Sequence, residues 1–376
     1  VLFCLFVLVV NPLAGLLCRS WQFTRAELVT VYLMGAVACS LATTGLVCRL
    51  LPHMSSGAYF ATPENEWAER VLPNLAGWLR VEDEQAIKWF YEGLPSGVPL
   101  PWGAWLRPLL AWAPMLLALF GAMTALMLMV RRQWLSNERL LFPLVQVPIA
   151  MIGDSDSRHG LFPALFRNPV VWVGILLPIL LYSQRALSHY FPFIPEGMPV
   201  AKYYYFWEDK FRLRLSLSYA VMGFGYLLST RLGFSIWFLG LVTSLEHGVL
   251  LHFGIVGTER VMGSALPSSN MVYQGFGAMV ALVVGLAWNS RRHLLGVIRT
   301  ALAGSCPPDG DEVLSCRQTL LLLAASATVM AGWLHLAGMS WWLVPVVIVV
   351  VFGLMVGITR IVAEGAPVSS PIGSNS

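Results

Sequence analysis

Glu246 and His247 are adjacent ionisable residues inside the apolar run Leu232–Val256, and His252 follows in the same run. Ionisable side chains within a membrane span are costly, so they usually face a cavity or a partner and often mark ion or proton paths. Since histidine titrates near neutral pH, the pair is a predicted carrier of a coupling proton. The alternatives are a polar helix–helix contact and a position near the membrane interface where the groups reach water. A zinc-protease motif is excluded because the two histidines are not one helical turn apart.

A second candidate lies in a polar turn that follows an apolar span and carries Glu138 and Arg139. The next segment, Leu140–Ile152, is apolar and includes Gln146, but it is too short for a full crossing and contains two prolines. We expect it to be a re-entrant or broken helix, and transporters place substrate and ion sites at such breaks. Glu138, Arg139 and Gln146 are therefore predicted substrate- or ion-binding residues. A cytoplasmic turn with a structural ion pair is the alternative.

Two further acidic residues lie at the ends of predicted helices, Glu27 beside Arg25 and Glu364 beside Arg360. Such residues are usually interfacial anchors or structural pairs. Glu364 stays a candidate because the Gly365–Pro367 stretch that follows can end a helix at a break. The sequence predicts no catalytic or metal-binding residue and no cofactor. Cys306 and Cys316 bracket a polar loop and could form a disulfide or bind a metal, but no CxxC spacing supports a special role.

The segments that hold these residues are too apolar to be buried in a water-soluble core, so the composition indicates a membrane protein. Of 376 residues, 57% are hydrophobic and 12% are charged, whereas soluble domains carry about 25% charged residues. The net charge of +4 is spread along the chain, so no nucleic-acid partner is expected. We predict an all-α integral membrane protein with roughly ten transmembrane or re-entrant helices. The segments are Val1–Leu17, Leu28–Leu51, Leu106–Val130, Leu140–Ile152, Pro169–Tyr182, Leu213–Thr230, Leu232–Val256, Val272–Trp288, Thr319–Leu336 and Trp341–Ile358.

The distribution of arginines orients this predicted single polytopic domain, residues 1–376. The densest short-loop clusters all fall on the cytoplasmic side if Leu140–Ile152 re-enters rather than crosses. Residues 52–105, which carry many acidic residues, tryptophans and prolines, then form one long extracytoplasmic loop. The chain begins at Val1 inside an apolar run with no charged n-region, so we expect it to be a piece of a longer protein. Gly223–Gly225 and Gly275–Gly277 are predicted to allow close helix packing.

Three stretches carry a family resemblance. They are Arg131–Leu144 (RRQWLSNERLLFPL), Ala61–Trp67 (ATPENEW) and Trp89–Pro95 (WFYEGLP). They resemble a family of uncharacterised polytopic bacterial membrane proteins that is distantly related to the oligopeptide transporter superfamily. Members of the superfamily carry a similar basic–acidic–Leu–Phe–Pro turn after a span, and Arg360–Gly365 is similar to another recurring piece. The resemblance implies movement of small peptides or metal chelates, usually driven by protons.

The predicted function is transport of a small solute across the bacterial inner membrane by alternating access, with the lipid bilayer and a small-molecule substrate as partners. A homo-oligomer is compatible with this prediction. A membrane-embedded enzyme is the main alternative, with an active site in the loops and Glu64, Glu66 or Asp83 as acid or base. A membrane subunit or scaffold of a larger complex is the third.

Overall fold

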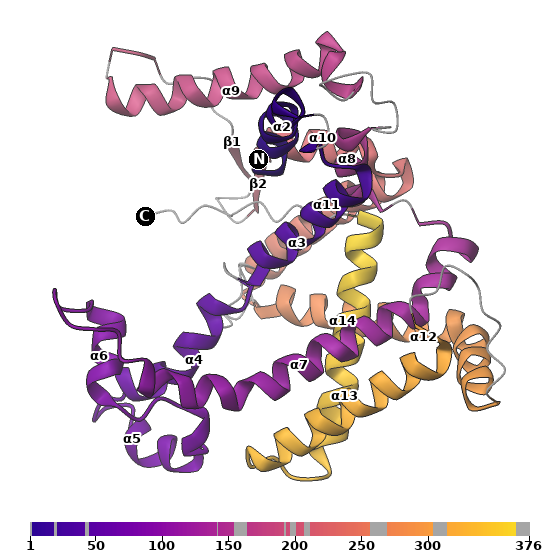
Figure 1. The fold of residues 1–376 in the computed structure, drawn as a ribbon. Coiled ribbons are helices and arrows are strands. Elements are labelled where there is room, and N and C mark those ends of the chain that lie inside the picture. The colour runs from indigo at the N-terminus through magenta and orange to yellow at the C-terminus, as the bar shows by residue number, and fades with distance from the viewer. Residues whose placement is uncertain are drawn as a thin grey trace. The chain divides into compact units, whose positions relative to one another are not determined.

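The computed structural model describes residues 2–18, 21–41, 45–140, 142–153, 164–191, 193–195, 201–206, 211–255, 269–303 and 314–365 (Figure 1). Most of these residues are helical. The helices are α1 (Leu2–Leu5), a π-helix (Phe6–Val10), α2 (Asn11–Leu17), α3 (Arg25–Ser40), α4 (Val47–Tyr59), α5 (Trp67–Arg70), 3-10 turns (Leu72–Asn74 and Gly77–Leu79), α6 (Glu84–Glu92), α7 (Trp102–Arg132), a second π-helix (Gln133–Asn137), α8 (Pro143–Ile152), a 3-10 turn (Ala164–Arg167), α9 (Pro169–Tyr190), α10 (Tyr219–Leu227), α11 (Thr230–His252), α12 (Ser269–Ala303), α13 (Cys316–Leu336) and α14 (Leu343–Gly365). Strands β1 (Ala201–Phe206) and β2 (Phe211–Ser216) form one antiparallel hairpin.

Six of the described helices are long and apolar enough to cross a membrane, which makes this a helical, multi-pass membrane protein. The two segments Phe6–Leu17 and Pro143–Ile152 are apolar but shorter. The six are Trp102–Leu135, Pro169–Tyr190, Thr230–His252, Asn270–Ala301, Cys316–Leu336 and Leu343–Gly365.

The prediction of roughly ten membrane segments is not met by the described residues, and one predicted span contains a strand. Leu28–Leu51 contains most of α3 and the start of α4, and the described residues Leu41 and Gly45 between them are π-helical. Leu213–Thr230 begins in β2 and continues in the short helix α10. The alternation Phe-Arg-Leu-Arg-Leu-Ser over β2 has the period of a strand, and this signal was missed.

The chain forms two compact units, each described separately. Unit 1 comprises Val1–Gly35, Leu140–Ala278 and Thr359–Ser376. Its core contains the buried residues Val7, Leu28, Ile152 and Phe166. Asn11 has a structural role in this unit, because its buried side chain accepts a hydrogen bond from the backbone N–H of Phe23 at 2.9 Å.

Glu27 has a structural role at the start of α3. Its carboxylate accepts a hydrogen bond from the backbone N–H of Thr24 at 2.8 Å, and the hydroxyl of Thr24 accepts one from the backbone N–H of Glu27 at 3.4 Å. This reciprocal arrangement is a capping box, which satisfies free donors at a helix N-terminus. Glu27 is therefore a helix-end residue, as the sequence suggested.

Unit 2 comprises Ala36–Arg139 and Met279–Ile358 and is built on the pairing of α7 with α13, which lie side by side in Figure 1. Gly121 faces Ser326, whose Oγ lies 2.6 Å from where a Cβ on Gly121 would be, so the glycine permits the close approach. The indole N–H of Trp333 donates to the carbonyl of Ala111 at 2.8 Å. Since Ala111 pairs with Trp333 and the later Gly121 pairs with the earlier Ser326, the two helices are antiparallel.

A second close helix contact in unit 2 involves a GxxxG sequence on α14. A Cβ on Gly357 would lie 2.5 Å from Sδ of Met279 and 3.0 Å from Cγ2 of Val283, both on α12, and a Cβ on Gly353 would lie 3.3 Å from Val283. By contrast, no described heavy atom lies within 4 Å of a Cβ built on Gly223, Gly225, Gly275 or Gly277. The predicted packing sites at those glycines are therefore not met, and the close contacts lie elsewhere.

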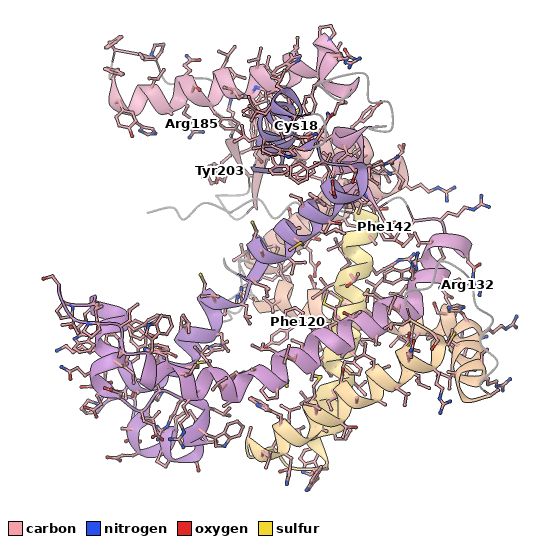
Figure 2. All side chains as sticks on the ribbon, viewed as in Figure 1. Cys18, Phe120, Arg132, Phe142, Arg185 and Tyr203 are labelled. Carbon is pink, nitrogen blue, oxygen red and sulfur yellow. The ribbon has the colours of Figure 1, made fainter. Side chains whose placement is uncertain are left out.

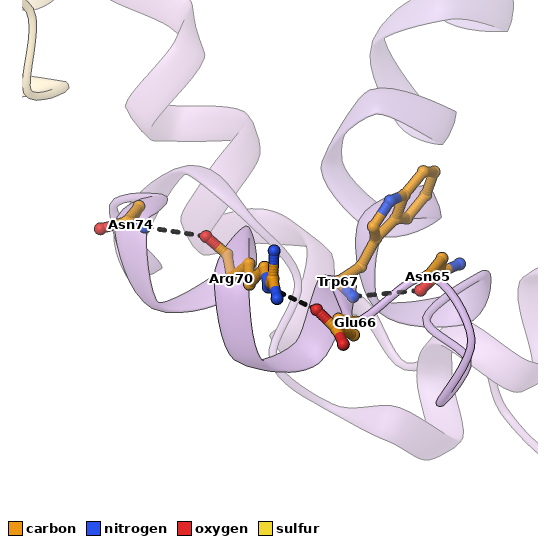
Figure 3. A network of polar contacts seen from close by, with 5 residues as sticks. All are labelled: Asn65, Glu66, Trp67, Arg70 and Asn74. Carbon is orange, nitrogen blue, oxygen red and sulfur yellow. Dashed lines mark hydrogen bonds and ion pairs between the residues drawn. The ribbon is translucent and has the colours of Figure 1, made fainter.

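The predicted loop of residues 52–105 is folded into short helices around the buried residues Met54, Val81, Ala86 and Ile87. The stretch ATPENEW forms a tight turn before α5 (Figure 3). There the side-chain oxygen of Asn65 accepts hydrogen bonds from the backbone N–H groups of Thr62 and Trp67, at 3.0 Å each. Arg70 forms an ion pair with Glu66. Cys316, the first residue of α13, is disulfide-bonded, and Cys306 lies outside the described residues.

Candidate functional site

Glu246 links two apolar helices of unit 1. It lies on α11, and its carboxylate accepts a hydrogen bond from the side-chain amide of Gln274 on α12. At 1.5 Å per residue, Glu246 is about 8 Å along the axis from the middle of α11. Half of the hydrocarbon core is about 15 Å thick. A membrane centred on α11 would therefore hold this carboxylate within its apolar layer, where an ionisable group is expensive and usually functional.

His247, the next residue, has a buried ring nitrogen that is not satisfied. Its Nδ1 is inaccessible to solvent and has no hydrogen-bond partner among the described residues. The neighbouring Gly248 is buried. Leaving a buried polar atom unpaired costs about 1–3 kcal/mol, so a group of this kind is expected to find a partner in another state of the protein. A carboxylate in a polar contact and an unpaired imidazole nitrogen are thus adjacent on one membrane helix.

Glu364 does not join this pair. It forms an i, i+4 ion pair with Arg360 on α14, whose Nε donates to the carboxylate at 2.6 Å. A Cβ on the adjacent Gly365 would lie 3.5 Å from Cδ2 of Leu232. Leu232 is at the start of α11, about 21 Å along the helix axis from Glu246 at 1.5 Å per residue. The predicted residues of unit 1 therefore do not form one site, and Glu364 is a local structural partner of Arg360.

Glu138 is held by a polar network in the π-helix that ends α7. The Gln133 side-chain amide donates to the Glu138 carboxylate at 3.1 Å, and the Asn137 side-chain amide donates to the Gln133 oxygen at 2.7 Å. Arg139 follows with φ of +50° and Phe142 with φ of +46°. Non-glycine residues in this region store strain and are typical of functional segments, as are π-helical turns. Residues up to Arg139 belong to unit 2, whereas Phe142 belongs to unit 1.

Gln146 lies in α8, which belongs to unit 1. Its side chain is exposed, whereas Pro143 and Pro148 of the same helix are buried. At ten residues α8 is too short to span a bilayer. It begins at Pro143, and the carbonyl of the preceding Phe142 accepts hydrogen bonds from the backbone N–H groups of Val145 and Gln146. The break between α7 and α8 is thus produced by two strained residues followed by a proline.

Sequence reasoning missed His293, which secures the same turn from α12. Gln133 donates its backbone N–H to Val130 rather than to Met129, one residue earlier, as a regular α-helix requires. The Met129 carbonyl is instead 3.1 Å from Nε2 of His293. The two residues are 164 positions apart, and no local pattern signals the contact.

Replacing His293 by alanine is expected to lower the free energy of unfolding by about 1–3 kcal/mol, because it leaves the buried Met129 carbonyl unpaired. His293→Gln is the matched variant, since its amide N–H can restore the donor. Unfolding by SDS in mixed micelles measures the free energy of unfolding of both variants. Equal stability of His293→Ala and the wild type would contradict the assigned bond.

Three acidic residues of the long predicted loop, Glu64, Glu66 and Asp83, have local hydrogen-bond or ion-pair partners. Asp83 caps α6 by accepting the backbone N–H groups of Gln85 and Ala86 at 2.9 and 3.1 Å, and Glu66 pairs with Arg70. Hydrogen bonds from its own backbone and from Thr62 lower the pKa of Glu64. A general acid at neutral pH needs a raised pKa, so Glu64 is poorly suited to that role. Among the described residues, no three His, Cys, Asp or Glu side chains are grouped to hold a metal.

Comparisons with known proteins identify a family but no individual relative. No curated protein matches the chain, and no solved structure matches it. A model of a family of unknown function matches residues 1–371, nearly the whole chain. This agrees with the resemblance to an uncharacterised family, and no link to the oligopeptide transporter superfamily is found. The chain belongs to the family described as "Family of unknown function (DUF6785)".

Proposed function

We propose that this protein is a transporter that moves a small solute across the bacterial inner membrane. The observation that carries the proposal is on α11, where Glu246, bonded to Gln274, is followed in the sequence by His247, whose buried Nδ1 has no hydrogen-bond partner among the described residues. Helices that only anchor a protein in lipid have no need of such groups. Ionisable residues on membrane helices usually serve an ion or substrate path.

The break between α7 and α8 supports the same proposal. The π-helix Gln133–Asn137, the strained Arg139 and Phe142, and the Gln133–Glu138 network form an irregular segment between the two helices. Transporters use broken helices of this kind in alternating access. The resemblance to the oligopeptide transporter superfamily suggests a peptide-like or metal-chelate-like solute.

Proton coupling through Glu246 is part of the proposal. Its test uses the protein in liposomes that contain a pH-sensitive dye, with di- to tetrapeptides or metal chelates added outside. We expect solute-dependent acidification of the interior, and at least a tenfold loss of this signal in Glu246→Gln, because glutamine cannot release a proton.

The control is Glu27→Gln, the same chemical change in a capping box, where glutamine is an accepted replacement. This variant is expected to retain wild-type activity. A solute flux that is indifferent to the pH gradient and unaffected by Glu246→Gln would overturn proton coupling. Absence of solute-dependent flux or ligand-induced thermal stabilisation across peptides, chelates, sugars and organic acids would overturn the transporter proposal itself.

A further inference from the structure

Arg80, like His247, has a buried side-chain nitrogen without a partner. Its Nε is inaccessible to solvent and forms no hydrogen bond with any described residue. The rest of the guanidinium also forms no hydrogen bond or ion pair within the described part of the chain. The side chain as a whole is half-buried, and its two Nη atoms, unlike Nε, are accessible. Arg80 is therefore a positive charge without a counter-charge among the described residues.

The acidic residues that follow Arg80 in the sequence are engaged elsewhere. The carboxylate of Glu82 lies against Gly77, where one of its oxygens is 2.5 Å from the position that a Cβ would take. The carboxylate of Asp83 caps α6 by accepting hydrogen bonds from two backbone N–H groups. Because a buried charge is costly unless it is paired, a partner for Arg80 must come from another source.

The backbone on both sides of Arg80 is anchored within unit 2. Before it, the carbonyl of Leu79 accepts a hydrogen bond from the indole N–H of Trp112 on α7 at 3.2 Å. After it, the backbone N–H of Val81 donates to the carbonyl of Met54 at 3.0 Å, and Val81 is only 1% exposed. An arginine on an anchored backbone loses less conformational entropy when it binds a ligand than one on a free loop.

The turn Gly77–Leu79 places Arg80 beside the ends of two membrane helices. The ring centroid of Trp78 in this turn lies 5.8 Å from that of Trp333, which is in the last turn of α13. Figure 2 shows the side chains of this part of the chain beside the start of α7. Tryptophans are enriched at the membrane–water interface, and at that level both lipid headgroups and soluble anions can reach an arginine.

We propose that Arg80 binds an oxyanion, a carboxylate or phosphate group that supplies the missing counter-charge. Two N–H groups of a guanidinium match two oxygens of such a group, and these charge-assisted hydrogen bonds are stronger than neutral ones. The accessible Nη atoms offer this pair of donors. The group can belong to a soluble molecule or to an anionic lipid, since both present the same oxygens. The proposal concerns unit 2 and does not depend on the transport assigned to Glu246 and His247 in unit 1.

The test is thermal unfolding of the delipidated, full-length protein in detergent, titrated separately with acetate, inorganic phosphate and phosphatidylglycerol. Sodium chloride at equal ionic strength and phosphatidylcholine are the references. A ligand that binds the folded state raises the unfolding temperature. We expect acetate or phosphate to stabilise the wild type beyond its reference if the oxyanion is soluble, and phosphatidylglycerol alone to do so if it is a lipid headgroup.

Two substitutions connect this response to the guanidinium. Arg80→Met keeps an unbranched side chain without a charge, so it should abolish the stabilisation by the oxyanion. Without the oxyanion this variant should be at least as stable as the wild type, because an unpaired buried charge is removed. Arg80→Lys keeps the charge but loses the paired donors, so its affinity for the oxyanion should be about tenfold weaker.

Arg70→Met is the matched control, because Arg70 lies in the same segment and already has Glu66 as its counter-ion. It should respond to the oxyanions as the wild type does. Absence of stabilisation by every oxyanion, unchanged stabilisation of Arg80→Met, or an equal loss in Arg70→Met would overturn the proposal. So would wild-type affinity in Arg80→Lys. A marked loss of stability or a failure to fold in Arg80→Met would also overturn it, since either would show that Arg80 is a structural residue.

Discussion

Trp333→Ala is expected to lower the free energy of unfolding by about 3–5 kcal/mol, the range for truncating a large aromatic side chain at a packed position. Trp333 joins three parts of unit 2. Its ring centroid lies 4.8 Å from that of Trp112 on α7 and 5.8 Å from that of Trp78 in the turn Gly77–Leu79. Its indole N–H also donates to the Ala111 carbonyl. Alanine removes all three interactions at once.

Two further variants separate these contributions. Trp333→Phe keeps an aromatic ring but removes the hydrogen bond, so it should cost only about 1 kcal/mol plus a packing term. Trp342→Ala removes the same type of side chain from a position that is 73% exposed and should have little effect. SDS unfolding in mixed micelles compares the three. A similar loss in Trp333→Ala and Trp342→Ala would show that the indole cluster does not hold α7 to α13.

Gly357→Leu is expected to separate α14 from α12 and to destabilise unit 2 by about 1–3 kcal/mol or more, the usual effect of adding bulk to a packed interface. Even a Cβ at this position meets Met279 and Val283. Gly357→Ala should cost much less, because Sδ of Met279 is at the far end of a flexible side chain. In membranes, glycines of this spacing permit the close backbone approach that drives helix association.

The steric cause can be tested by a second substitution. Met279→Ala in the Gly357→Leu background should recover part of the lost stability, since it removes the nearest obstructing atom. Gly285→Leu on α12 is the control, because no described heavy atom lies within 4 Å of a Cβ there. Thermal unfolding in detergent measures the stability of the double variant and of the Gly285→Leu control. If Gly285→Leu is as destabilising as Gly357→Leu, intrinsic loss of glycine rather than a clash explains the result.

Local patterns in the sequence predicted several parts of the candidate site. The apolar run that contains Glu246 and His247 is indeed one helix, α11, because its composition and length leave little alternative. The end of α7 after Arg132 and the proline-started α8 were also predicted from local signals. The strand in Leu213–Thr230 was not, because mean hydropathy does not distinguish a continuous helix from other apolar elements.

By itself, the sequence determined that this is a helical membrane protein and which helices carry ionisable residues, since both follow from the composition of short, contiguous stretches. Only the tertiary structure decided which distant residues meet. It paired Glu246 with Gln274 and Met129 with His293, and it separated Glu364 from the Glu246–His247 pair. Such contacts depend on how helices cross and on where glycines let them approach, and neither is written in the local periodicity of any one segment.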